Sequence, residues 1–158
     1  MQDLNLPKSK VRLEQKEGKT YIFDPIRKKM LLLTPEEWVR QQFLQMLLSM
    51  GISKGLVGIE GGLKVNKIQK RADLLIFDRG GAPFLLIECK APSIKLSNET
   101  FKQVAAYNAT IKAPYIGITN GLQHYFCAIN FENSSYDFLK EIPLPEYVKQ
   151  HDKNSNDK

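Results

Sequence analysis

The sequence predicts one mixed α/β domain, in which helices pack on a central mixed β-sheet. Short, nearly continuous apolar runs, typical of buried strands, alternate with two helical segments. The chain of 158 residues is long enough for one core, and its apolar (42%) and charged (25%) fractions are those of a soluble globular protein. We expect a polar lead-in over residues 1–20, the domain over 21–147 and a disordered tail over 148–158.

The first elements are two short strands, at 21–23 and 30–33, separated by the turn-prone pair Asp24-Pro25. A helix then begins with Thr34 as N-cap, Pro35 at the first helical position and Glu37 completing a capping box. It is expected to extend to about Met50 and stop at the following glycine. Its large apolar residues should be buried: Trp38, Phe43, Leu44, Leu47 and Leu48.

Residues 56–65 suggest an irregular strand, and 72–77 and 84–89 are predicted to be central strands buried on both faces. The six residues between the last two have turn chemistry. Asn98 is predicted to cap a second helix that ends near Ile111. Strands at 115–119 and 125–129 follow, joined at Asn120-Gly121.

Charge and cysteine content narrow the class of protein. The formal net charge is +6, which favours a polyanion such as DNA, although solubility alone explains a charge of this size equally well. Cys89 and Cys127 lie in apolar runs and are expected to be buried thiols. We expect a cytoplasmic protein, because no apolar run approaches the roughly 18 residues of a membrane helix and no signal peptide is recognisable.

Three residues at the open end of the central hairpin carry the predicted chemistry. If Phe77 opposes Phe84, then Asp73 lies opposite Glu88, on the same face. Lys90 shares that face because it lies two residues beyond Glu88. Two close carboxylates repel one another unless a cation lies between them, and hard oxygen ligands suit Mg²⁺. The Cys89 carbonyl is a further candidate ligand; the structural alternative is an Asp73–Lys90 pair that only balances charge.

These residues resemble a known family. Arg71-Ala72-Asp73, followed by Glu88-Cys89-Lys90-Ala91-Pro92, is similar to the PD-(D/E)xK restriction-endonuclease-like superfamily. Gln103 and Tyr107, one helical turn apart, resemble the Gln-x-x-x-Tyr element of the N-terminal nuclease domain of type I restriction enzyme R (motor) subunits. The segments 35–41 and 119–121 resemble further segments of that family, over about residues 21–130.

The resemblance implies a restriction-endonuclease-like fold and a role for each matching residue. Asp73 and Glu88 would bind Mg²⁺, for which Mn²⁺ can substitute, and Lys90 would be catalytic. Gln103 and Tyr107 would position DNA or the attacking water, although a helix face packed on the sheet also explains them. Glu37, with Glu36 as substitute, would be the acid that many members bring near the metal from the first helix.

Arg71 and Lys70 are candidate DNA contacts, and a surface salt bridge explains Arg71 as well. The implied function is a Mg²⁺-dependent DNA endonuclease; the alternative is a non-catalytic nucleic-acid-binding or partner-docking module with the same fold. The sequence has no Gly-rich Lys-Ser/Thr phosphate loop, so we expect a stand-alone domain or a fragment and carry over no ATP dependence. Expected partners are DNA and other restriction-system subunits, and a homodimer would suit cutting of both strands.

Overall fold

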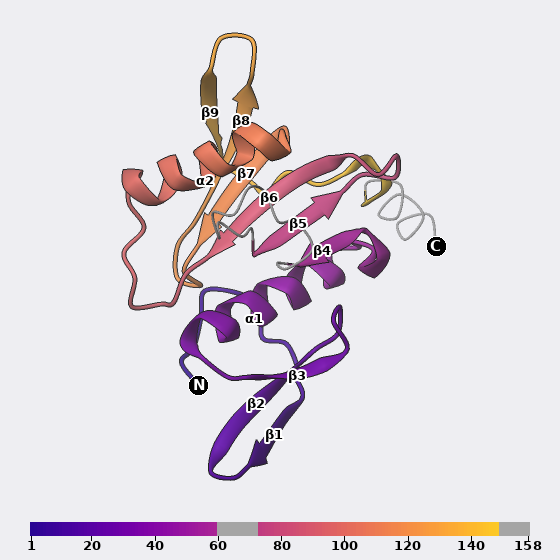
Figure 1. Ribbon diagram of the computed structural model, residues 1–158, viewed down its shortest axis with the longest axis vertical. Coiled ribbons are helices and arrows are strands. Elements are labelled where there is room, and N and C mark those ends of the chain that lie inside the picture. Colours follow the sequence, from indigo (N-terminus) through magenta and orange to yellow (C-terminus); the bar gives the residue numbers. More distant parts are fainter. Residues whose placement is uncertain (60–72, 149–158) are drawn as a thin grey trace.

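The computed structural model describes residues 1–59 and 73–148, which form two β-sheets and two α-helices (Figure 1). A three-stranded antiparallel sheet comes first, followed by the first helix, a short 3-10 turn and a six-stranded sheet that holds the second helix in its crossover. In chain order the elements are β1 (Leu13–Lys16), β2 (Lys19–Asp24), β3 (Lys29–Leu32), α1 (Pro35–Ser49), the turn η1 (Lys54–Leu56), β4 (Val57–Ile59), β5 (Leu74–Phe77), β6 (Pro83–Cys89), α2 (Asn98–Ile111), β7 (Tyr115–Thr119), β8 (His124–Asn130) and β9 (Ser135–Leu139).

The larger sheet is mixed, as predicted. Its strands follow chain order from β4 to β9, and every neighbouring pair is antiparallel except β6 and β7. The parallel pair requires a crossover, and α2 provides it. The loop that leads from β6 to α2 begins at Lys90, directly after the carboxyl end of β6 and two residues beyond Glu88.

The two helices cover opposite faces of this sheet (Figure 1). Successive side chains of a strand point to opposite faces, so Leu74 and Ile87 pack in the cluster that contains the apolar side of α1. Leu75 and Leu86 instead pack with the apolar side of α2. The central strands are therefore buried on both faces, as their continuous apolar runs predict.

Helix α1 follows the sequence-based expectation closely. The Thr34 hydroxyl accepts a hydrogen bond of 3.1 Å from the backbone N–H of Glu37, as an N-cap should. Phe43, Leu44 and Leu47 are fully buried, whereas Trp38 and Leu48 are half-buried.

Residues 1–20, expected to be a polar lead-in, contain the exposed strand β1, which pairs with β2. Leu4 also packs against the core beside α1, and the Asn5 N–H donates to the Gly121 carbonyl at 2.8 Å. Gly121 has φ +85°, and a Cβ there would lie 2.7 Å from a methyl carbon of Leu4. Backbone hydrogen bonds thus order parts of residues 1–20, and such bonds produce no periodic pattern of apolar side chains in the sequence.

Other departures are local. Ser97, not Asn98, caps α2, and its hydroxyl accepts a hydrogen bond from the Thr100 N–H. Strand β9 was not predicted. Val148, assigned to the tail, is fully buried, while 149–158 and the predicted strand beyond Ile59 lie outside the described residues. Cys89 and Cys127 are buried free thiols, as expected. Neither helix in the described parts of the chain has the length and apolar character to cross a bilayer.

Candidate active site

The β5–β6 hairpin has the register predicted from the sequence over its central pairs. Leu74 pairs with Ile87 and Ile76 with Leu85. A bulge then shifts the pairing, so that Phe77 opposes Pro83 and not Phe84 as expected. Asp73 directly precedes β5, one residue before the pair of Leu74 and Ile87, with which the paired part of the hairpin ends.

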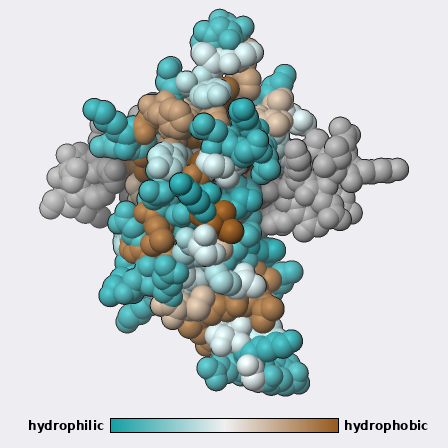
Figure 2. Space-filling model, turned by 90° about the vertical axis from the view of Figure 1, so that its left-hand side faces the viewer, coloured by the Kyte–Doolittle hydropathy of each residue, from teal (hydrophilic) through white to brown (hydrophobic). Residues whose placement is uncertain are grey.

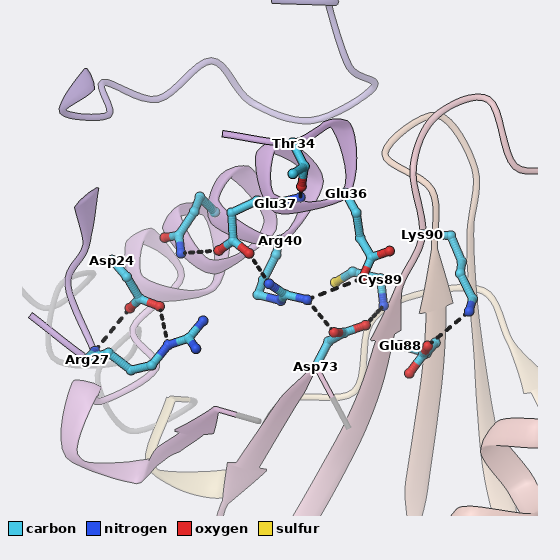
Figure 3. A network of polar contacts seen from close by, with 11 residues as sticks. Asp24, Arg27, Thr34, Glu36, Glu37, Arg40, Asp73, Glu88, Cys89 and Lys90 are labelled. Atoms are coloured by element: carbon cyan, nitrogen blue, oxygen red, sulfur yellow. Dashed lines mark hydrogen bonds and ion pairs between the residues drawn. The ribbon is translucent and has the colours of Figure 1, made fainter. Parts of the chain in front are cut away.

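The carboxylate of Asp73 is buried and held at both oxygens (Figure 3). Asp73 is only 3% exposed. Arg40 Nη2 lies 2.5 Å from Oδ1, and the backbone N–H of Cys89 donates to Oδ2 at 2.6 Å. The charge partner of Asp73 is therefore Arg40 on α1, and the structural alternative of an Asp73–Lys90 pair is not the arrangement found.

Glu88 and Lys90 form a separate ion pair, with 3.2 Å between Oε1 and Nζ. Glu88 pairs in register with Ile118 of β7, whose side chain lies in the α2 cluster. Glu88 and Ile118 therefore share the face of the sheet that α2 covers. Lys90 leaves the strand there, and its backbone N–H donates to the Thr119 carbonyl at 2.8 Å.

Arg40 is the residue of this site that the sequence-based reasoning missed. It is only 6% exposed, and besides Asp73 it contacts Glu37 and, at 3.3 Å, Glu36. The sequence did contain a signal for a buried Arg40: it follows two glutamates by one helical turn, on the side of the helix that buries Val39 and Phe43. That pattern is common on exposed helix surfaces and did not stand out.

Glu36 and Glu37 have different surroundings. The carboxylate of Glu37 is buried against Arg40, and its Oε1 accepts a hydrogen bond of 2.9 Å from Gln41 Nε2. The side chain of Glu36 is 47% exposed, and its charge acts on Asp73, Glu88 and Lys90. Glu36, the substitute in our prediction, is thus the first-helix acid that faces this group of residues.

Burial, and to a smaller extent neighbouring acids, raises the pKa of both Asp73 and Glu88. Burial raises the pKa of Asp73 to about 6, although the charge of Arg40 and the Cys89 N–H oppose the shift. Burial and then the charge of Asp73 raise the pKa of Glu88 to about 7, against the effect of Lys90. Burial would lower the pKa of Lys90, but Glu88 outweighs it and the pKa is raised.

A divalent cation fits the chemistry of this donor set. A carboxylate has about four lone-pair sites, so Asp73 retains acceptor capacity after its contacts to Arg40 and Cys89. Two carboxylates are what Mg²⁺ usually takes from a protein, with water and phosphate oxygens as its other ligands. The described residues contain no cluster of three or more His, Cys, Asp or Glu side chains set for a metal, so water, a carbonyl or a phosphate would have to complete the shell.

The helix residues and the basic residues of the prediction occupy different positions. Gln103 is exposed on α2, while Tyr107, one turn later, packs against the sheet in the α2 cluster. Within residues 1–59 and 73–148, neither side chain hydrogen-bonds to Asp73, Glu88 or Lys90 in this structure. Lys70 and Arg71 lie outside the described residues.

The Thr119-Asn120-Gly121 segment supports the chain that follows Lys90. Asn120 Nδ2 donates to the Ile94 carbonyl at 2.8 Å, while its Oδ1 accepts the backbone N–H groups of Leu122 and Gln123. The segment therefore ties the β7–β8 turn to the loop between β6 and α2 and restrains the position of Lys90.

Comparisons with known proteins were made on both sequence and structure. No curated protein matches the sequence. The structure is similar to a fragment assigned as an HsdR subunit of a type I restriction enzyme from Vibrio vulnificus YJ016, with a TM-score of 0.49 and 18% identity. That match covers 79% of this chain and 26% of the other, so the chain spans about a quarter of that protein's length.

The family comparison covers most of the site. The model of the family described as type I restriction enzyme R protein N terminus matches residues 35–143, which include α1, the central hairpin and α2. More than half of the chain is matched, and the chain belongs to the family of type I restriction enzyme R protein N-terminal domains.

Proposed function

We propose that this domain is a metal-dependent DNA endonuclease whose active site consists of Asp73, Glu88 and Lys90. The observation that carries the proposal is geometric: the buried carboxylate of Asp73, held by Arg40 and the Cys89 N–H, acts on a second carboxylate, Glu88, which pairs with Lys90 at the end of β6. Burial raises the pKa of both carboxyls, and a divalent cation would relieve the cost of keeping the two acids ionised close together. Family membership gives the restriction-enzyme context.

Each residue has a role that its position permits. Asp73 and Glu88 would hold Mg²⁺ or Mn²⁺, with the Cys89 carbonyl as a further candidate ligand. A metal held there would supply a lower pKa for a coordinated water and stabilisation of charge on the phosphate. Lys90, anchored beside Glu88, would orient the attacking water or stabilise the negative charge that develops as the P–O bond to the leaving sugar breaks.

Cleavage of supercoiled plasmid tests this proposal. Wild-type protein should nick plasmid with Mg²⁺ or Mn²⁺, and Asp73→Ala and Lys90→Ala should not. Lys54→Ala is a matched control, because Lys54 is exposed beyond the C-terminal end of α1, whereas the site lies at its N-terminal end. Nicking that survives both site substitutions would show that another site, or a contaminant, does the cutting.

A second candidate is a non-catalytic nucleic-acid-binding or docking module. One observation favours it: Arg40 already supplies a positive charge to Asp73. Titration with Mn²⁺ separates the two candidates, because a binding module needs no metal. Absence of Mn²⁺ binding at millimolar concentration, together with salt-sensitive DNA binding, would support the module and contradict the nuclease.

A further inference from the structure

Arg40 stands at the centre of a chain of polar contacts that joins α1 to the start of β5 and the end of β6 (Figure 3). From the helix side, Gln41 donates to Glu37, and Glu37 contacts Arg40. From the sheet side, Arg40 contacts Asp73, which accepts the N–H of Cys89. The contacts connect residues separated by 33 and 16 positions in the sequence.

This arrangement fixes the orientation of the Asp73 carboxylate. A carboxylate held at one oxygen can still rotate about its Cβ–Cγ bond, but one held at both oxygens cannot. Arg40 holds Oδ1 and the Cys89 N–H holds Oδ2, so removal of either contact frees that rotation. The lone pairs left over for a ligand therefore point in a fixed direction.

Stability alone is a weak explanation for these contacts. Desolvating Arg40, Glu37 and Asp73 together is unfavourable, and buried ion pairs can often be replaced by apolar residues without loss of stability. What an apolar replacement could not supply is a rigid fork that reaches two carboxylates at once. The planar guanidinium does this, and the lysine ammonium does not.

We infer that Arg40 is a positioning residue, which orients Asp73 for the metal through its guanidinium fork, and that Glu37 acts through Arg40 and not as a metal ligand. The inference rests on the proposed metal-dependent function. It gives Glu37 a role different from the one that the family resemblance implied, and leaves Glu36 as the acid that faces the site. Contacts of this kind behind metal ligands typically change metal affinity or activity by about 10–100-fold.

Mn²⁺ titration of the full chain, by calorimetry and by the metal dependence of plasmid nicking, tests the inference. Arg40→Lys keeps the charge but loses the fork, and we expect the half-saturating Mn²⁺ concentration to rise by about 10–100-fold. At saturating Mn²⁺ its nicking rate should recover toward that of wild type, a split that a general loss of structure would not give. An unchanged half-saturating concentration would overturn the inference.

Further variants keep the test decisive. Arg40→Met should also weaken Mn²⁺ binding; tighter binding would instead make Arg40 a competitor of the metal.

Glu37→Gln should raise the half-saturating Mn²⁺ concentration by less than Arg40→Lys does. Complete loss of metal binding in this variant would make Glu37 a ligand and contradict the inference. Arg27→Met, which breaks another buried Asp–Arg pair, is the control and should leave the Mn²⁺ dependence unchanged. If Arg40→Lys titrates like wild type while wild type binds Mn²⁺ and cuts, only this inference fails; if wild type binds no Mn²⁺, the proposed function fails with it.

Discussion

Two buried aspartates of this protein each pair with an arginine, and their surroundings differ. Asp24 is the fully buried last residue of β2; its Oδ1 accepts the N–H groups of Ile26 and Arg27 in the following turn, and its Oδ2 lies 2.9 Å from Arg27 Nε. All of its partners come from the next three residues. Asp73 draws its partners from α1 and β6 and stands near a second carboxyl, Glu88.

The difference separates a local structural role from a site (Figure 3). The Asp24 carboxylate accepts hydrogen bonds from backbone N–H groups of the turn that follows it, which is the usual way in which an aspartate stabilises a turn. The contacts of Asp73 do not form a turn; they place an acid at the meeting point of three elements, beside another acid whose pKa is raised to about 7. The second acid nearby, and not burial or an arginine partner alone, distinguishes Asp73 from Asp24.

The largest expected difference between substitutions of Asp73 and of Asp24 is in the rate of DNA cleavage. Asp73→Asn keeps the size of the side chain but removes the anionic ligand, so we expect metal-dependent nicking to fall by at least about 100-fold. Asp24→Asn should leave nicking within about twofold of wild type, because the turn it holds lies outside the site. Equal loss in both variants, measured as initial nicking rates at matched folded concentration, would remove the distinction between the two aspartates.

The Asp24 carboxylate should matter for the stability of the fold. Asp24→Ala leaves two backbone N–H groups and Arg27 without their acceptor, and we expect a loss of about 1–3 kcal/mol in the free energy of unfolding. Urea unfolding at pH 7 without metal measures it. A loss below a few tenths of a kcal/mol would show that water replaces the carboxylate and that the turn does not depend on it.

Neutralising the other acid of the site should stabilise the metal-free protein. Because the pKa of Glu88 is raised in the folded state, its favourable contribution is fully present below the unfolded value of 4.5 and lost as pH rises through about 7. Glu88→Gln should therefore increase the free energy of unfolding at pH 8 by about 1–2 kcal/mol, with no gain below pH 4.5. Destabilisation at pH 8 would mean that the pair with Lys90 outweighs the burial of the carboxylate.

The sequence carried much of the fold and part of this site. Continuous apolar runs and capping chemistry located both helices and the central strands, and the predicted register holds for the pairs Leu74–Ile87 and Ile76–Leu85. Arg40 escaped prediction because its partner Asp73 lies 33 residues away, and spacing along a helix says nothing about a partner on another element. Strand β1 escaped because main-chain pairing orders it while its four residues remain exposed.

Surface hydropathy offers no comparable guide to the site. Figure 2 shows apolar side chains scattered among hydrophilic ones on the side of the molecule that it presents. Large exposed apolar residues such as Phe138 and Tyr136 lie on the edge strand β9, five strands away from β4 in the sheet order. Electrostatics at the strand ends is therefore the more informative property here.

Metal should stabilise the protein in a pH-dependent way if the Asp73 site binds it. At a Mn²⁺ concentration ten times the dissociation constant, we expect a gain of about 1.4 kcal/mol in the free energy of unfolding. The gain should shrink between pH 8 and pH 6, because protons compete for Glu88 and Asp73, whose pKa values are about 7 and about 6. Asp24→Ala should keep this response and Asp73→Asn should lose it; thermal unfolding with and without Mn²⁺ compares them.

The smallest expected effect comes from the acid at the rim of the site. Glu36→Gln removes a half-exposed charge that acts on Asp73 and Glu88, and we expect the half-saturating Mn²⁺ concentration to rise only about two- to threefold. Salt screens exposed charges, so the difference should fade as ionic strength is raised toward 1 M. Glu14→Gln, which removes a similarly exposed acid beside Arg12, is the matched control and should change nothing. A loss of tenfold or more in Glu36→Gln that persists in high salt would instead make Glu36 a direct metal ligand, and would extend the site from the sheet onto the first turn of α1.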